Sequence, residues 1–344
     1  MCEWACVPTA SEAAVRRGQE GSRHGQRIDP ALRLHQLFVC IKKGLWTLSS
    51  GPDLSEFRLE GPEFLGHIIN HAVPDPRDGR TLLVAARTGH LGPTVFRSLD
   101  LGATWAEATR PPAFPKAEDG AAPRAVAHTF ALVPGHESEP GVWYAGTSPE
   151  ALFRSENAGE SWKSVAGFND SAWASAELPW AADEGLEPTP GTPDGDILHG
   201  ILIDPRDPDH VYIATSANAG GVFESTDRGK TWQPLNQGCD ANIAPDSAAM
   251  EVGFDPHCVK LHPLAPDRLW QQKHCGIYRL ERPGRRWERV GRRMPADIGD
   301  IGFPIALHPR DVDTAWVFPM DGTDVWPRIS PDGRPALYVT RDGG

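Results

Sequence analysis

The segment Ser225-Thr-Asp227-Arg-Gly229-Lys-Thr231-Trp232 decides the fold, because it recurs along the chain. Two other segments align with it without gaps: Ser98-Leu-Asp100-Leu-Gly102-Ala-Thr104-Trp105 and Ser155-Glu-Asn157-Ala-Gly159-Glu-Ser161-Trp162. A degenerate copy of the motif ends at Trp287, and a further copy begins at Thr340 and reaches only Gly344. Successive Trp residues are about 55–70 positions apart, which is the period of a repeat architecture.

Each copy follows a short run of β-forming residues with an aromatic side chain two positions before the Ser position: Phe96, Phe153, Phe223, Tyr278 and Tyr338. A turn containing Pro lies about 25–30 residues before each copy, at Pro76, Pro134, Pro205, Pro263 and Pro309, and is followed by another such run. Four antiparallel strands per repeat are typical of a propeller blade. The sequence therefore predicts an all-β fold, a six- or seven-bladed β-propeller of four-stranded antiparallel blades.

The repeated motif is similar to the Asp-box, or BNR repeat, and residues 37–344 resemble the sialidase-like glycosyl hydrolase superfamily. Sortilin-like and photosystem-assembly-factor-like propellers share this repeat. The residue types of the box have a structural explanation: Asp or Asn accepts backbone N–H bonds in a turn, Gly supplies a positive φ, and Trp packs between sheets. We therefore expect a structural role for Ser98, Asp100, Gly102, Trp105, Ser155, Asn157, Gly159, Trp162, Ser225, Asp227, Gly229 and Trp232.

The chain is expected to form one domain, a propeller over residues 37–344. Residues 1–36 lack the repeat and are rich in Arg, Gly, Ser and Ala, which predicts a disordered tail or a start-site artefact. The first blade, over residues 37–60, lacks a first strand, and the last blade stops in the middle of a hairpin. We expect the C-terminus to be truncated, with the missing strands downstream.

Charge and hydropathy exclude several classes of function. The 344 residues include 34 Lys+Arg and 46 Asp+Glu, a formal net charge of −12, which argues against a nucleic-acid partner. No apolar stretch approaches the ~20 residues of a membrane span, and the N-terminus has no apolar signal core. We expect a cytoplasmic protein without a membrane partner. Its six Cys lack metal-finger spacing, which favours free thiols.

A histidine-rich position is the sharpest functional signal. Six residues before the Pro of each repeat stand Asn70, His128, His199, His257 and Phe303, near the upper end of the innermost strand. His71, His90 and His274 are expected at the same end, where the loops are long. This pattern predicts a ligand site at the top of the central channel. The alternatives are hydrogen bonds to neighbouring blades and a divalent metal at the ring, although no cofactor is expected.

The resemblance implies glycoside hydrolysis, for which Asp196, Glu251 and Asp300 are the candidate acid and base, unless they are solvated loop charges. A true exo-sialidase is not supported, because the four Tyr belong to the repeat and neither an Arg triad nor an Arg-Ile-Pro motif is found. The alternative is a non-catalytic scaffold that binds a carbohydrate or protein at the top face, helped by Trp173 and Trp180. An enzyme requires two carboxylates converging in one pocket.

Overall fold

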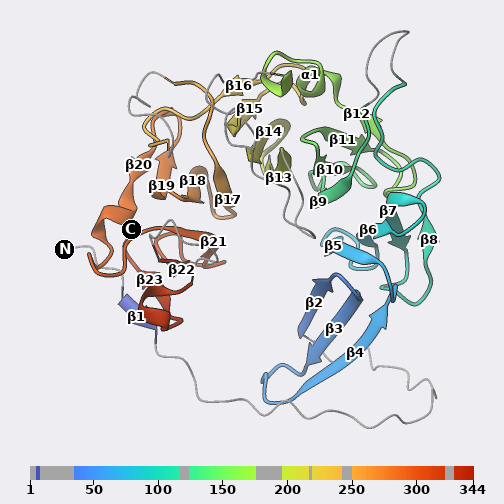
Figure 1. Ribbon diagram of the computed structural model, residues 1–344, viewed down its shortest axis with the longest axis horizontal. Helices are drawn as coiled ribbons and strands as arrows, with labels where there is room; N and C mark the ends of the chain where they lie inside the picture. Colours follow the sequence, from blue (N-terminus) through green and yellow to red (C-terminus); the bar gives the residue numbers. More distant parts are fainter. Residues whose placement is uncertain are drawn as a thin grey trace.

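The computed structural model describes residues 5–7, 35–116, 124–175, 196–216, 219–241, 250–321 and 329–344, which form six antiparallel sheets around a central channel (Figure 1). The predicted all-β propeller is confirmed, with six blades. Blade 1 contains β2 (His35–Ile41), β3 (Gly44–Ser50) and β4 (Phe57–Glu63); blade 2 contains β5 (Ile68–Pro74), β6 (Leu82–Thr88), β7 (Gly92–Ser98) and β8 (Ala106–Glu107).

The next three blades are complete four-stranded sheets. Blade 3 contains β9 (His128–Pro134), β10 (Trp143–Ser148), β11 (Leu152–Ser155) and β12 (Lys163–Ser164); blade 4 contains β13 (Ile197–Asp204), β14 (Asp207–Ser216), β15 (Gly221–Ser225) and β16 (Gln233–Pro234). Blade 5 contains β17 (Pro256–His262), β18 (Ala265–Lys273), β19 (Gly276–Glu281) and β20 (Glu288–Arg289); blade 6 contains β21 (Gly302–Leu307), β22 (Ala315–Pro319) and β23 (Leu337–Thr340).

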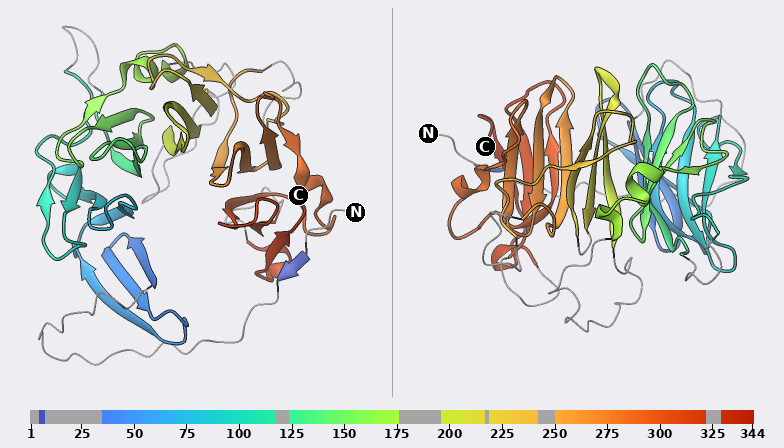
Figure 2. Two further views of the ribbon diagram at one scale, coloured as in Figure 1. Left: turned by 180° about the vertical axis from the view of Figure 1, so that it is seen from behind. Right: turned by 90° about the horizontal axis from the view of Figure 1, so that it is seen from above.

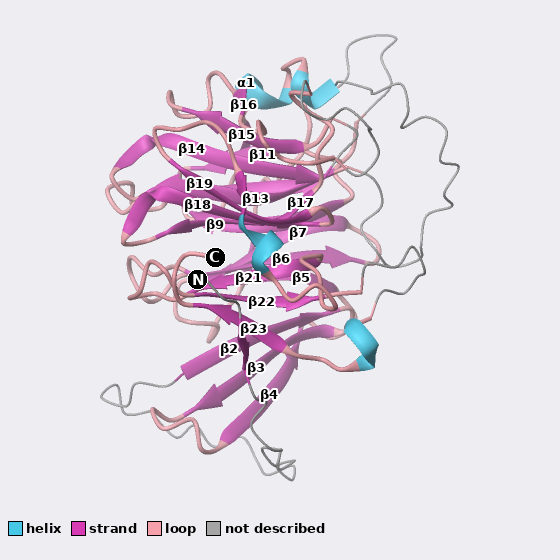
Figure 3. Ribbon diagram, turned by 90° about the vertical axis from the view of Figure 1, so that its left-hand side faces the viewer, coloured by secondary structure: helices cyan, strands magenta, loops and turns pink. Residues whose placement is uncertain are grey.

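Helix is scarce in this fold, as Figure 3 shows. Within the described residues, one short helix, α1 (Ala166–Asn169), and the 3-10 turns Trp173–Ser175, Val290–Arg293 and Pro331–Gly333 lie in the connections. In the part of the chain that the structure describes, no helix is long and apolar enough to cross a bilayer.

Hydrophobic cores lie between the blades, because alternate residues of each strand face opposite neighbours. Leu83, Trp143 and Phe153 fill the core between blades 2 and 3 and are completely buried. The second strand of each blade packs on the first strand of the next, as β10 does on β13 and β18 does on β21. This stacking produces the curved row of sheets seen edge-on in Figure 2.

The Asp-boxes are hydrogen-bonded turns whose partners lie within the box. Asp227 accepts bonds from the Thr231 amide and hydroxyl at 2.9 and 2.6 Å, and the Ser225 hydroxyl accepts from the Gly229 amide at 2.8 Å. Gly229 has a φ of 82°, which only Gly adopts at little cost. Trp232 is buried and donates to the Gly229 carbonyl. These contacts agree with the structural role predicted for the boxes.

The described residues leave the ring open between blades 1 and 6 (Figures 1 and 2). Strand β2 packs on β5 as other second strands pack on the next first strand, so β2 is a second strand, and among the described residues blade 1 has no first strand. Phe38 and Cys40 of β2 face blade 2, whereas Leu37, Val39 and Ile41 are exposed on its other face.

The outermost strand of blade 6 comes from an unexpected part of the chain. The sequence predicts this strand downstream of the last repeat, but in the structure β1 (Ala5–Val7) takes the position and pairs with β23. Val7 stands opposite Leu337 and Ala5 opposite Val339. Residues 1–36 were expected to lie outside the fold; the rest of that segment, apart from His35 and Gln36 of β2, lies outside the described residues.

Candidate ligand-binding site

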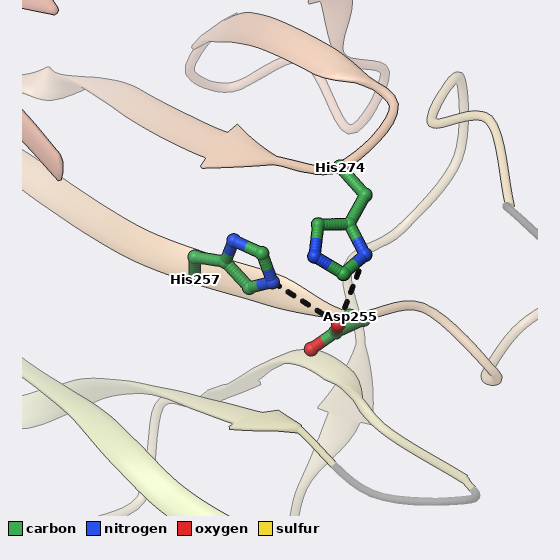
Figure 4. A group of neighbouring side chains, drawn as sticks. All are labelled: Asp255, His257 and His274. Atoms are coloured by element: carbon green, nitrogen blue, oxygen red, sulfur yellow. Dashed lines mark hydrogen bonds and ion pairs between the residues drawn. The ribbon is translucent and has the colours of Figure 1, made fainter. Parts of the chain in front are cut away.

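Three side chains of blade 5 converge at one end of the central channel, which we call the upper end because the connections between blades and between second and third strands meet there. Asp255 immediately precedes β17, His257 is its second residue, and His274 lies in the turn between β18 and β19. Asp255, His257 and His274 form the upper cluster (Figure 4). His257 Nε2 lies 3.1 Å and His274 Nδ1 lies 3.7 Å from Asp255 Oδ2.

The neighbouring blade fixes the orientation of His257. Its ring stacks on Phe303 of β21, with 4.2 Å between the ring centroids and 5° between the planes. Its Nδ1 lies 3.1 Å from the carbonyl oxygen of Gly302. His274 meets the His257 ring edge-on at 4.2 Å. The His257 ring is therefore held between strands of two blades, and His274 packs against it from a short turn.

The histidines also set the charge of the carboxyl group. Burial works to raise the pKa of Asp255, but the hydrogen bond from His257 and the nearby His274 outweigh it and hold that pKa well below its usual value. Asp255 is consequently ionised at neutral pH. Its side chain keeps 40% of its surface exposed, and its Oδ1 atom is buried.

Blade 4 extends the upper cluster by a further imidazole. His199 Nε2 lies 3.1 Å from the Ser216 hydroxyl, which also contacts the carbonyl of Pro256 at 3.3 Å. Burial lowers the pKa of His199 to about 4, so this ring is neutral at pH 7. The upper end therefore offers one neutral imidazole, one carboxylate and two further imidazoles within two neighbouring blades.

The other histidine-ring positions take part in contacts between blades. Asn70 Nδ2 donates to the carbonyl of Thr129 at 3.1 Å and lies 3.5 Å from His128 Nδ1. His128 Nε2 also lies 3.5 Å from the Arg87 guanidinium. These residues link blade 2 to blade 3 and do not belong to the upper cluster.

Two further histidine candidates lie in blade 2, away from the upper cluster. His71 Nδ1 accepts a bond from the Leu132 amide at 3.0 Å, and burial, helped by the charge of Lys260, lowers its pKa. His90 is exposed in the turn between β6 and β7. Of the seven predicted ligand residues, the structure thus brings together His257 and His274, with His199 beside them.

The candidate carboxylates are not equivalent in the structure. Asp300 is buried and receives two hydrogen bonds from Arg289, at 2.9 and 2.8 Å, so its charge is already compensated. Glu251 has an exposed side chain, and its backbone carbonyl accepts from Asn236. The third candidate, Asp196, immediately precedes β13 at the upper end.

Glu150, which the sequence did not single out, is coupled to Asp196. It is 8% exposed in the turn between β10 and β11. Burial, and then the charge of Asp196, raises the pKa of Glu150 to about 7. A carboxyl group that stays protonated near neutral pH beside an ionised one is the pattern of a general acid and base.

The aromatic candidates are mostly structural. Tyr144, Tyr212, Tyr278 and Tyr338 are all buried, which agrees with their assignment to the repeat and leaves none of them as an exposed nucleophile. Trp173 packs on the core between blades 3 and 4, with its ring 6.2 Å from that of Phe223. Trp180 and the rest of residues 176–195 lie outside the described residues.

A cavity of about 370 Å³ lies at the opposite end of the channel, among the turns that join first and second strands. Its walls are largely apolar and include Val133, Ile201, Ile203 and Leu261. Its charged neighbours are Arg77 and Glu137. Since Arg77 is already bound to Asp75 at 2.6 Å, the cavity offers few polar groups that could orient a ligand.

Sequence reasoning missed Asp255, although a signal for it exists. At the position two residues before the histidine-ring residue, the repeats carry Ile68, Val126, Ile197, Asp255 and Ile301. One blade therefore replaces an apolar residue with a carboxylate, at the position where the structure places it against two imidazoles. Asp255 is therefore identified by its difference from the equivalent residues of the other repeats, and not by the repeat pattern itself.

Comparisons with known proteins agree with the fold. The model of the BNR/Asp-box repeat matches residues 223–234. No curated protein matches the sequence. Among solved structures, an ancestral GH74 enzyme is 17% identical with a TM-score of 0.52, covering 80% of this chain and 30% of that chain. The COPII outer coat vertex on membranes is 10% identical with a TM-score of 0.52, covering 88% of this chain and 66% of that chain.

A GH74 xyloglucanase from Xanthomonas campestris is 20% identical, with a TM-score of 0.38, and covers 92% of this chain and 59% of that chain. This chain thus spans less than two thirds of the length of each of these three proteins. At such identities the similarity establishes the fold alone. The chain is a six-bladed β-propeller built from Asp-box repeats, and its function has to be argued from its own side chains.

Proposed function

We propose that this propeller binds a carbohydrate ligand at the upper end of its channel, on Asp255, His257 and His274 with His199 beside them. The observation that carries the proposal is the convergence of His257 and His274 on the Asp255 carboxylate. An ionised carboxylate accepts hydrogen bonds from sugar hydroxyls, and imidazole both donates and accepts. The Phe303 ring, stacked on His257, places an apolar side chain beside these polar groups.

The position of these groups supports recognition at this end rather than elsewhere. They lie on strand ends and a short turn, so little conformational entropy is lost when a ligand binds. The polar groups meet at one place, whereas the cavity at the other end of the channel is lined mainly by apolar side chains. A few convergent polar groups on a rigid scaffold are typical of a specific small-ligand site.

The test is a screen of the purified protein against an array of neutral and acidic oligosaccharides, followed by calorimetry with each oligosaccharide that binds. We expect His274→Ala to weaken binding at least about tenfold, a change of about 1.4 kcal/mol. His90→Ala is the matched control, since this exposed imidazole lies at the same end but in blade 2. Equal losses in both variants, or no binding to any oligosaccharide, would count against the proposal.

A second candidate, glycoside hydrolysis, is favoured by the Glu150–Asp196 pair. In this reaction the protonated Glu150 carboxyl gives its proton to the glycosidic oxygen while the carbon–oxygen bond breaks. The Asp196 carboxylate takes a proton from the water that forms the new bond to carbon. The raised pKa of Glu150 is the observation behind this assignment.

Hydrolysis is tested by incubating the protein with nitrophenyl glycosides and with polysaccharides and measuring released phenol and reducing ends. If the wild type is active, Glu150→Gln and Asp196→Asn should each lower kcat at least about 100-fold. His274→Ala should affect mainly KM. A wild type that releases nothing from any substrate, or a Glu150→Gln variant with full activity, would remove this candidate and leave the binding proposal standing.

A further inference from the structure

The charges that compensate Asp255 differ from those of the arginine-paired carboxylates. Four buried carboxylates have arginine partners: Asp75 with Arg77, Asp204 with Arg206, Glu224 with Arg282 and Arg285, and Asp300 with Arg289. In the described segments, the ion-pair partners of Asp255 are the imidazoles of His257 and His274. No arginine or lysine lies within ion-pair distance of it there, and the Lys273 ammonium acts on it only through its charge.

The hydrogen bonds of His257 fix the role of each ring nitrogen. Its Nδ1 lies 3.1 Å from the Gly302 carbonyl, which can only accept a hydrogen bond, so Nδ1 carries a proton. In the neutral ring, Nε2 then presents a lone pair toward Asp255 Oδ2, 3.1 Å away. Two lone pairs at this distance need a cation between them, either a second proton on the ring or a metal ion.

The arrangement around His257 is that of a metal ligand held by a second partner. Ligating histidines in proteins donate their other N–H to a carbonyl or carboxylate, which orients the ring and raises its basicity. Gly302 provides this carbonyl, and the Phe303 ring packs flat on the imidazole. The lone pair of His257 is thereby aimed at Asp255 by the neighbouring blade.

The ligand atoms are close enough to share one ion. One nitrogen of each histidine and one oxygen of Asp255 all lie within 4.8 Å of one another. Ligands at the 2.0–2.1 Å of a tetrahedral zinc site are about 3.3 Å apart, close to the 3.1 and 3.7 Å separations from Asp255 Oδ2.

We propose that Asp255, His257 and His274 form a binding site for a divalent first-row transition-metal ion, for which Zn²⁺ is the best match. Two imidazole nitrogens and one carboxylate oxygen suit Zn²⁺ rather than Ca²⁺ or Mg²⁺, which select oxygen ligands. Three protein ligands leave at least one coordination position open for water or another small ligand. This inference goes beyond the proposed carbohydrate site, because an ion can bind here whether or not a sugar does.

The test uses the full chain, stripped with EDTA and dialysed against Zn²⁺ alone, with metal measured by elemental mass spectrometry and affinity by calorimetry. We expect one Zn²⁺ per chain in the wild type, and a loss of affinity of at least about 100-fold in His274→Ala and in Asp255→Asn. His90→Ala is the matched control: its exposed imidazole lies at the same end but in blade 2 and outside the triad, so stoichiometry should stay at one.

Cobalt provides a second, spectroscopic readout of the site. The wild type loaded with Co²⁺ should show the intense visible absorption of a four-coordinate nitrogen and oxygen site, and Ca²⁺ should not displace the ion. Wild-type protein that binds no Zn²⁺ above the level of the Asp255→Asn variant would overturn the proposal, and so would an absorption spectrum unchanged in that variant. Both results are obtained without any saccharide, so failure of the metal site and failure of carbohydrate binding are distinguishable.

Discussion

Glu150 makes the stability of this propeller depend on pH in a way that one substitution can isolate. The side chain is 8% exposed, and burial together with the charge of Asp196 raises its pKa from 4.5 to about 7. Between these two values the native state keeps a proton that the unfolded chain has lost. Stability therefore falls as pH rises through this window, and the loss is complete above pH 7.

The size of the effect follows from the pKa difference. A shift of this size corresponds to about 3 kcal/mol of stability that is present below pH 4.5 and absent above pH 7. Glu150→Gln keeps the size and the polar groups of the protonated side chain but cannot ionise. The variant should therefore gain stability relative to the wild type as pH rises, by up to about 3 kcal/mol between pH 4.5 and pH 8.

The assay is urea denaturation of both proteins at closely spaced pH values, comparing the difference in unfolding free energy at each pH. Titrating groups that do not interact with Glu150, such as His199, are common to the two proteins and cancel in this difference. Glu137→Gln, which changes an exposed carboxylate, should give a difference that hardly varies with pH. A Glu150→Gln difference that is equally flat would refute the reasoning.

Three further substitutions test the scaffold by urea denaturation. Gly146→Ala should destabilise by about 1–3 kcal/mol, because the new Cβ would lie 2.2 Å from the Leu198 carbonyl oxygen, whereas Gly89→Ala meets no atom within 4 Å and should be nearly neutral. Glu224→Ala should cost about 3–5 kcal/mol, because it leaves two arginines without their buried partner; a cost below 1 kcal/mol would contradict this. Asp227→Ala should cost about 1–2 kcal/mol through the lost turn hydrogen bonds, and an unchanged midpoint would show that the box is dispensable.

The fold could be predicted from the sequence because its decisive contacts are local. Every partner of Asp227 in its turn lies within four residues, so the motif itself contains the structure. The runs of β-forming residues on either side of each motif then predict strands, and their repetition along the chain predicts a stack of similar sheets. The pairing of Val7 with Leu337 could not be predicted, because it joins opposite ends of the chain and the three-residue strand carries no repeat signal.

The candidate site could be predicted only as far as the repeat determines it. Repeat alignment placed His199 and His257 correctly at the upper ends of first strands, since equivalent residues of equivalent strands occupy equivalent positions. The alignment could not show which carboxylate would remain available to a ligand. Asp300 is hydrogen-bonded to Arg289, and this contact depends on the conformation of a long side chain from another strand. The coupling of Glu150 to Asp196 likewise arises from burial between blades.

The residues that depart from the repeat pattern carry the argument for a site in blade 5. Where four repeats have Ile or Val, this blade has Asp255, and where the other repeats have His or Asn, blade 6 has Phe303. A repeat that served only to build blades would gain nothing from either change, since both positions already had residues that pack or hydrogen-bond. Both departures contact the same imidazole: Asp255 meets His257 Nε2, and Phe303 stacks on its ring. Because the two changes come from different blades and orient one side chain, they are better explained by a requirement at His257 than by the stability of either blade.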